Sequence, residues 1–176
     1  MTNVNEEKLA LHGGAPVRSE EKAWPQWPVF DASEETALID VLRSGNWFHG
    51  PRVAAFEKTY AAFQDAAHCI TTNSGTSALE IILEALNIGP GDEVIIPPYT
   101  FVATASAVMR VGAVPVFADL DLSWCLDPQQ ARAAISENTR AIMPVHFGGR
   151  ISDMDRLMEI SREYGIDIIE DARQSG

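Results

Sequence analysis

The stretch VIIPPYTFVATASAVMRVGAVPVF, residues 94–117, decides the fold because two short apolar runs flank a helical pattern. Residues 94–96 and 114–117 have the length and the β-branched content of buried strands. Between them, residues 100–111 carry apolar side chains at helical spacing. A strand, a helix and a second strand in this order predict a parallel pair joined by a crossover helix.

The same alternation continues outward along the chain on both sides of this stretch. Strict alternation of strands and helices is typical of an α/β fold, in which helices cover both faces of a largely parallel sheet in α/β/α layers. The further elements that we predict are strands at 69–72, 140–145 and 166–169, and helices at 76–86, 128–135 and 153–164, the last closed by Gly165.

Two helices are predicted ahead of this alternation. Asp31 is the expected N-cap of the first, and Glu34 stands where a capping box requires it. Ser44-Gly45 should end that helix, because glycine is favoured just beyond a helix end. Gly50-Pro51 should begin the second helix, since proline is favoured in the first helical turn.

Residues 1–30 are predicted to form a leading arm, and residues 31–176 to form the N-terminal part of one larger domain. We expect the arm not to be helical, because Trp24-Pro25 and Trp27-Pro28 favour extended backbone before each proline. The two tryptophans should lie on an apolar surface, which is either the body of the domain or a second subunit.

The composition excludes several classes of protein. The formal net charge of -12 disfavours nucleic acid as a partner, because an acidic surface repels phosphate. Cys69 and Cys125 are far apart and form no metal-binding pair, so we predict two packing thiols, no metal site and a reducing compartment.

No segment predicts secretion or membrane insertion. The residues 1–8 are polar and lack the apolar core of a signal peptide. The longest apolar stretch, residues 102–118, is interrupted by Arg110, Gly112 and Pro115. We therefore predict a cytoplasmic protein with no membrane partner.

Small hydroxyl residues mark the first candidate site. Thr72-Asn73-Ser74-Gly75-Thr76-Ser77 lies between a predicted strand and a predicted helix. Backbone N–H groups at the start of a helix bind anions, and Gly75 would let a ligand approach the backbone. A plain N-cap explains the same residues equally well.

Further candidates follow the later strands, at the same edge of the predicted sheet. Phe101 could form a wall for a ring, or it could pack in the core. Glu170 and Asp171 are adjacent on a strand and should point to opposite faces. Asp171 would suit a protonated ring nitrogen, with an N-cap as the alternative. His146 could contact a ligand or could satisfy the backbone of its loop.

An anion site, an aromatic wall and a carboxylate for a ring nitrogen together describe a site for pyridoxal 5'-phosphate. The sequence also resembles the DegT/DnrJ/EryC1/StrS family of sugar aminotransferases from about Leu11 onward. The motifs that carry the resemblance are NSGTSAL at 73–79, GPGDEVI at 89–95, PYTFVAT at 98–104, PVH at 144–146 and EDARQ at 170–174.

The resemblance implies a large domain of the aspartate aminotransferase type (fold type I), working as a homodimer. It implies that Gly75 and Thr76 hold the cofactor phosphate and that Phe101 stacks on the pyridine ring. It further implies that Asp171 pairs with the ring nitrogen and that Gln174 bonds the ring hydroxyl. Arg173 and Ser175-Gly176 differ from the small residue and the histidine often found around this glutamine in the family.

The family also implies a Schiff-base lysine after the Asp-x-x-Gln motif, beyond Gly176. Lys8, Lys22 and Lys58 are the lysines of this chain, and none is expected to serve in its place. We therefore expect no catalytic residue in these 176 residues, and we expect the rest of the large domain and a small C-terminal domain to be absent. The chain alone should be inactive.

The predicted function of the whole protein is transfer of an amino group from glutamate or glutamine to a keto-sugar or cyclitol ketone. Two alternatives stay open. One is a sugar dehydratase of the same family, in which a histidine replaces the lysine. The other is a non-catalytic dimerising or scaffold relative. The coding sequence beyond residue 176 distinguishes the three hypotheses.

Overall fold

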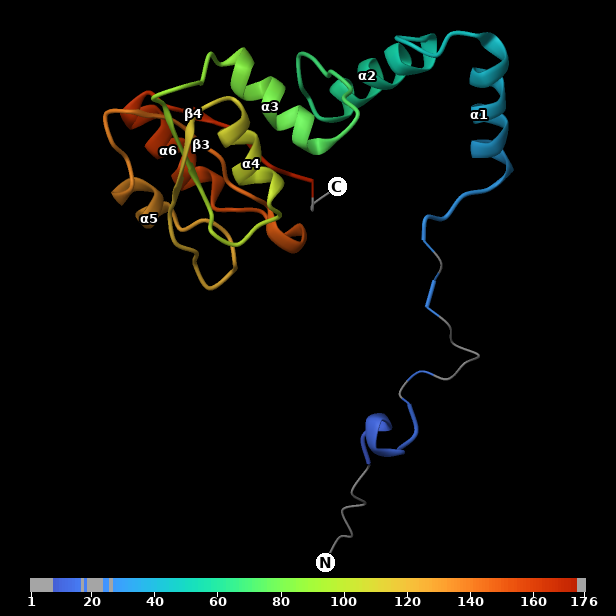
Figure 1. The fold of residues 1–176 in the computed structure, drawn as a ribbon, viewed down its shortest axis with the longest axis horizontal. Helices are drawn as coiled ribbons and strands as arrows, with labels where there is room; N and C mark the ends of the chain where they lie inside the picture. The colour runs from blue at the N-terminus through green and yellow to red at the C-terminus, as the bar shows by residue number, and fades with distance from the viewer. Residues whose placement is uncertain (1–7, 17, 19–23, 26, 174–176) are drawn as a thin grey trace, which may run out of the picture. The chain divides into compact units, whose positions relative to one another are not determined.

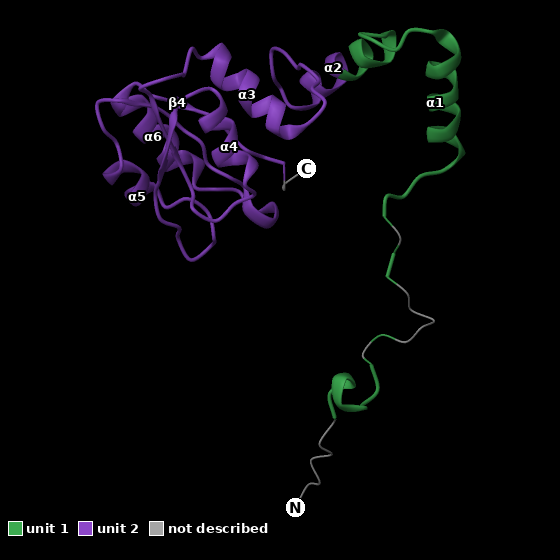
Figure 2. Cartoon of the chain, in the orientation of Figure 1, with its two compact units in different colours: residues 1–56 green, residues 57–176 purple. Residues whose placement is uncertain are grey.

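The computed structural model describes residues 8–16, 18, 24–25 and 27–173. Contacts between residues divide the chain into two compact units, residues 1–56 and 57–176 (Figure 2). Each unit is described by itself below. In the described part of the chain, no helix is both long and apolar enough to cross a membrane.

The leading helices form as predicted. Helix α1 (Ala32–Ser44) begins with a complete capping box between Asp31 and Glu34 and ends at Gly45, whose φ of 71° is left-handed. The N–H of Ser33 donates to the Asp31 carboxylate, and chiefly for this reason the pKa of Asp31 lies below its usual value. Helix α2 (Pro51–Phe63) begins at the predicted proline.

The arm differs from the prediction in one place. Ala10–His12 form a single 3-10 turn, η1, which ends at Gly13 with a φ of 85°. The prediction of no helix is therefore wrong at these residues, because one turn needs only the hydrogen bond from Gly13 N–H to Ala10 O (3.1 Å). The side chains of Trp24 and Trp27 are 79% and 90% exposed, and the Arg18 guanidinium lies 4.1 Å from the Trp24 ring centroid.

The second unit is built on a parallel sheet, as predicted (Figure 1). Its strand order is β2-β1-β3-β4, and each neighbouring pair is parallel. Strand β1 lies inside the sheet, so the chain passes from β2 on one side of it to β3 on the other. The strands are β1 (Glu93–Ile96), β2 (Val114–Phe117), β3 (Thr139–Ile142) and β4 (Asp167–Ile168).

Helices cover both faces of the sheet, which confirms the three-layer prediction. Neighbouring strand residues point to opposite faces, so Ile96 is buried against α3 and α4, whereas Ile95 is buried among residues of α5 and α6. Each face therefore has its own apolar core. The helices are α3 (Gly75–Ala85), α4 (Ala103–Arg110), α5 (Pro128–Ala133) and α6 (Met154–Tyr164), with a short 3-10 helix η3 (Phe147–Gly149).

The predicted strand at residues 69–72 is wrong, because these residues form no strand in the described structure. A strand needs a neighbour that accepts its backbone hydrogen bonds. At Thr71 a side chain takes that place, since both its N–H and its hydroxyl donate to Glu57 Oε1 at 2.9 Å. Cys69 nearby is a half-buried free thiol, and Cys125 is a buried one.

Candidate cofactor site

The site lies between β1 and β3, where the order of the strands reverses: β1 connects to β2 on one side, and β3 connects to β4 on the other. Helices α3 and α4 cover one face and α5 and α6 the other, so the switch point falls at the carboxyl ends of β1 and β3. A cavity of about 440 Å³ opens there, within the usual range of small-molecule sites. Its lining residues are Asn73, Ser74, Gly75, Thr76, Leu79, Thr100, Phe101, Ala103, Val145, Asp171 and Arg173.

The N-terminus of α3 forms one wall of the cavity. Ser74 is its N-cap, and the Ser74 Oγ accepts a hydrogen bond from the Ser77 N–H at 3.1 Å. Gly75 and Thr76 come next, and as first-turn residues they have no carbonyl one helical turn earlier to accept their N–H groups. The N-cap interpretation is therefore correct for Ser74, and the N–H groups of Gly75 and Thr76 remain suited to an anion.

Arg173 lies directly over Gly75. A Cβ placed on Gly75 would stand 2.9 Å from Arg173 Cδ, which is closer than a Cβ approaches another atom in proteins, and in ordinary contact with Nε at 3.5 Å. Arg173 also lines the cavity, so it brings a guanidinium to the same wall as the helix N-terminus. The sequence showed Arg173 only as a departure from the family pattern.

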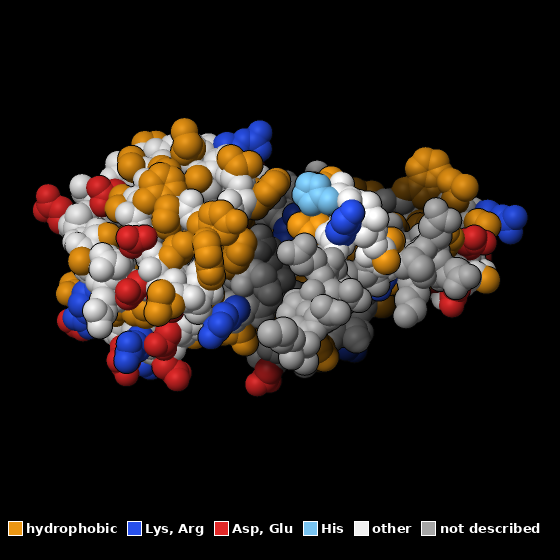
Figure 3. Space-filling view, turned by 90° about the horizontal axis from the view of Figure 1, so that it is seen from below, with side chains coloured by type: hydrophobic (Ala, Val, Ile, Leu, Met, Phe, Trp, Pro, Cys, Tyr) orange, Lys and Arg blue, Asp and Glu red, His pale blue; other side chains and the backbone are white. Residues whose placement is uncertain are grey.

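Phe101 lines the cavity from the segment between β1 and α4, and its side chain is 60% exposed. The alternative of a core residue is therefore wrong. Further aromatic rings follow along this edge of the sheet, since Tyr99 contacts Trp124 and Phe147 with ring centroids 5.2 and 4.8 Å apart. Figure 3, which views the molecule from below the orientation of Figure 1, shows hydrophobic side chains gathered on the second unit.

Asp171 faces the cavity from the segment after β4. Its backbone pairs with the segment that continues β3. The Asp171 N–H donates to Pro144 O (3.0 Å), and the Asp171 C=O accepts from the His146 N–H (3.1 Å). Its Oδ2 accepts a hydrogen bond from the Thr104 hydroxyl at 2.7 Å, and its Oδ1 accepts one from the Arg173 N–H at 3.4 Å. The carboxylate is thus held from the backbone and from α4.

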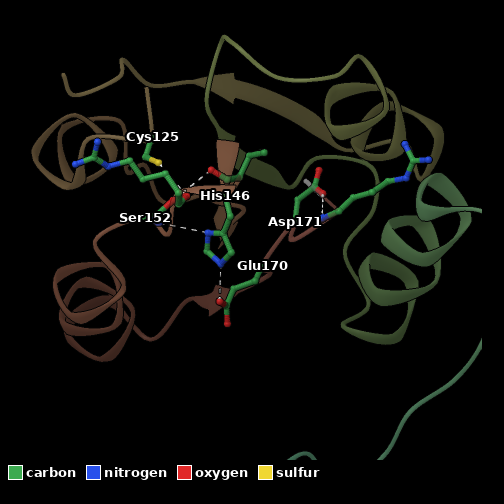
Figure 4. A network of polar contacts seen from close by, with 8 residues as sticks. Cys125, His146, Ser152, Glu170 and Asp171 are labelled. Atoms are coloured by element: carbon green, nitrogen blue, oxygen red, sulfur yellow. Dashed lines mark hydrogen bonds and ion pairs between the residues drawn. The ribbon is translucent and has the colours of Figure 1, made fainter. Parts of the chain in front are cut away.

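Glu170 and Asp171 point to opposite sides, as the strand pattern predicts (Figure 4). Glu170 Oε2 lies 3.0 Å from His146 Nε2, and the Ser152 N–H approaches His146 Nδ1 at 3.4 Å. Since Nδ1 accepts, the N–H at Nε2 donates the hydrogen bond to Glu170. His146 is 5% exposed and does not line the cavity, so its loop contact is the interpretation that the geometry supports.

Three other sequence candidates are not tested by this cavity: Gln174 and Lys22 lie outside the described residues, and Lys8 lies in the first unit. Lys58, which the structure describes in the second unit, does not line the cavity. No role was predicted from the sequence for Thr100 and Thr104, although the helix predicted at 100–111 would place residues four apart on one face. In the structure Thr100 precedes α4, and the two hydroxyls lie 2.9 Å apart.

The sequence profile of the DegT/DnrJ/EryC1/StrS aminotransferase family matches residues 28–175, which is most of the chain. The chain belongs to this family. A curated relative is the L-glutamine:2-deoxy-scyllo-inosose aminotransferase of Streptomyces kanamyceticus, with 44% identity over 176 residues. The aligned region is 96% of this chain and 41% of that protein, so the chain spans about two fifths of the length of that relative.

Solved structures of similar proteins have the same fold. The crystal structure of 3-amino-5-hydroxybenzoic acid synthase superposes with a TM-score of 0.85 and 40% identity, over 87% of this chain and 41% of that one. The PLP form of Spr1654 from Streptococcus pneumoniae gives a TM-score of 0.75 and 35% identity, over 80% of this chain and 36% of that one. The chain therefore has the α/β architecture of PLP fold type I enzymes.

The residues around the cavity fit the cofactor of this family. Pyridoxal 5'-phosphate requires donors for its phosphate, an apolar face for its ring and a carboxylate for its ring nitrogen. The helix N-terminus at Gly75 and Thr76 is a set of donors, Phe101 is an exposed ring, and Asp171 is a carboxylate that two other groups already hold. The donor chemistry thus matches each part of the cofactor.

Proposed function

We propose that this chain is the N-terminal part of a PLP-dependent aminotransferase that moves an amino group from glutamine or glutamate to a keto-sugar or cyclitol ketone. The observation that carries the proposal is one cavity bordered by the N-terminus of α3, Phe101 and Asp171. The relatives add support, because the one from Streptomyces kanamyceticus is named for glutamine and a cyclitol ketone.

Each residue has a role in this proposal. The N–H groups of Gly75 and Thr76 bind the cofactor phosphate, with the α3 dipole behind them. Phe101 packs on the ring, and Asp171 holds the proton on the ring nitrogen. When bound, the cofactor supplies an electron-poor ring that accepts the electron pair left by a departing substrate proton. Gln174 is proposed to bond the ring hydroxyl.

The proposal extends to the whole protein. Residues 1–30 form the arm, and residues 31–176 form the first part of the cofactor-binding domain. The lysine that binds the cofactor covalently belongs to the segment after the Asp-x-x-Gln motif, which these residues do not include. We propose a cytoplasmic homodimer, consistent with the exposed apolar side chains of Trp24 and Trp27.

The test uses the full-length protein, meaning the complete product of the reading frame that encodes this chain. The purified protein is incubated with PLP, with either glutamine or glutamate labelled with ¹⁵N at the α-amino group, and with one of a panel of cyclitol ketones and keto-sugars. We expect one ketone class to yield a ¹⁵N-amine, together with 2-oxoglutaramate when glutamine is the donor or 2-oxoglutarate when glutamate is the donor, detected by mass spectrometry. Cofactor binding without transfer to any ketone, or no cofactor binding at all, would contradict the proposal.

A further inference from the structure

Thr104 carries a completely buried hydroxyl beside the candidate cofactor site. It is the second residue of α4, and its side chain has no exposed surface. The hydroxyl lies 2.7 Å from Asp171 Oδ2 and 2.9 Å from the hydroxyl of Thr100. The cavity is lined by Thr100 and Asp171 but not by Thr104. Thr104 therefore reaches the cavity only through these two neighbours.

In these two hydrogen bonds, the donors and acceptors can be assigned in only one way. A hydroxyl has a single proton, and an ionised carboxylate can only accept. Thr104 therefore donates its proton to Asp171 Oδ2, which leaves a lone pair of its oxygen for Thr100. Thr100 must then donate to Thr104, so the bonds run from Thr100 through Thr104 to Asp171. Hydrogen bonds in such a chain polarise and strengthen one another.

This arrangement holds Asp171 more firmly than a surface carboxylate. Both the N–H and the C=O of Asp171 bond to the segment after β3, and the Thr104 hydroxyl holds the carboxylate through Asp171 Oδ2. The bond from Thr104 has an ordinary O–H···O length, whereas the bond from the Arg173 N–H to Oδ1 is long at 3.4 Å. Thr104 is thus the principal side-chain contact that orients this carboxylate.

We propose that Thr104, supported by Thr100, is a positioning residue that orients the Asp171 carboxylate toward the ring nitrogen of the cofactor. The inference rests on the proposed function. Thr104 does not touch the cofactor in this proposal; it restricts the rotation of Asp171, so that less free energy is needed to order the site when the cofactor binds.

The test compares Thr104→Val, which keeps the shape and removes the hydroxyl, with Thr104→Ser, which keeps the hydroxyl. Both are made in the full-length protein and titrated with ¹⁵N-labelled pyridoxamine 5'-phosphate, a form of the cofactor that needs no lysine. We expect Thr104→Val to weaken binding about tenfold or more and to change the ring-nitrogen chemical shift. Thr104→Ser should bind within about threefold of the unaltered protein and keep its chemical shift.

A double-mutant cycle separates positioning from mere stability. If Thr104 acts through Asp171, Thr104→Val should cost little further affinity in a protein that already carries Asp171→Asn. An equal loss in both backgrounds would overturn the inference, as would equal losses for valine and serine. If Thr104→Val does not fold, Thr100→Val tests the same series of hydrogen bonds. We then expect a smaller loss of affinity for the cofactor, and an unchanged affinity would overturn the inference.

The two proposals fail in different ways. No binding of the cofactor by the unaltered protein would overturn the proposed function, and the inference with it. Normal binding by a folded Thr104→Val variant would overturn the role of Thr104 and leave the proposed function standing.

Discussion

The side chain of Arg173 lies against the α carbon of Gly75, with Cδ 2.9 Å from the position that a Cβ on Gly75 would occupy. Gly75 is the first residue of α3, and Arg173 follows β4 nearly a hundred residues later in the chain. The contact joins the helix N-terminus proposed for the phosphate to the segment that carries Asp171. A Cβ on Gly75 would therefore require the Arg173 side chain to shift.

Gly75→Ala should therefore affect stability in a way that depends on Arg173. Alanine favours a helix over glycine by up to about 1 kcal/mol, but its Cβ would push Arg173 aside. In an Arg173→Ala background the Cβ has room, so Gly75→Ala should stabilise the protein there. We expect the two backgrounds to differ by about 0.5 kcal/mol or more in denaturant unfolding. Additive effects would show that the two residues do not contact in solution.

The adjacent carboxylates Asp171 and Glu170 should differ sharply in their effect on activity. Asp171→Asn keeps the shape but removes the charge that faces the cavity, and we expect amino transfer by the full-length protein to fall about 100-fold or more. Glu170→Gln is the matched control, because Glu170 faces His146 on the other side. Its transfer rate should stay within about threefold of the unaltered protein. Comparable losses in both variants would contradict the assignment of faces.

Leu83 should be a major determinant of the core between α3 and the sheet. Its side chain is fully buried in that core, so Leu83→Ala should reduce the free energy of unfolding by about 2–5 kcal/mol. Leu83→Met conserves volume and should cost less than about 1.5 kcal/mol. Denaturant unfolding of the full-length protein measures both values. A cost for alanine no greater than that for methionine would mean that this core is loosely packed.

Asp121 should make stability depend on pH in acid. Its pKa lies below the usual value, chiefly because the Ser123 hydroxyl donates to it, with backbone N–H groups of Ser123 and Cys125 adding to the effect. The unfolded chain therefore takes up this proton first as pH falls. The stabilisation is present above about pH 4 and is lost as pH falls through the lower pKa of the folded state.

Asp121→Asn tests this prediction, since asparagine can still accept from the Ser123 N–H but has no charge. The difference in unfolding free energy between the unaltered protein and the variant should shrink between pH 6 and pH 3. A difference that stays constant over this range would assign the stabilisation to shape and not to charge.

Local patterns predicted most of the secondary structure. The capping box of Asp31 and Glu34, the proline at residue 51 and the glycine at 165 mark helix ends through contacts within one turn. Such contacts depend on neighbours in sequence, so they can be predicted without the fold. The prediction of a strand at 69–72 was wrong for the opposite reason, because the hydrogen-bond partners of a strand must come from a distant segment.

The candidate site was predicted only in part. Gly75, Thr76, Phe101 and Asp171 line one cavity, as their positions at the edge of a parallel sheet implied. The alternation of a strand also separated Glu170 from Asp171 correctly (Figure 4). The roles of these residues toward a cofactor stay predictions, and Gln174 lies outside the described residues.

By itself, the sequence determined the α/β alternation, the edge of the sheet at which ligand-binding groups gather and the family of the protein. These properties follow from periodicity and from motifs that are local in the chain. The tertiary structure alone decided that Thr104 orients Asp171 and that Arg173 covers Gly75. Those contacts join residues that are far apart in sequence, and only the packing of α3, α4 and the sheet brings them within reach.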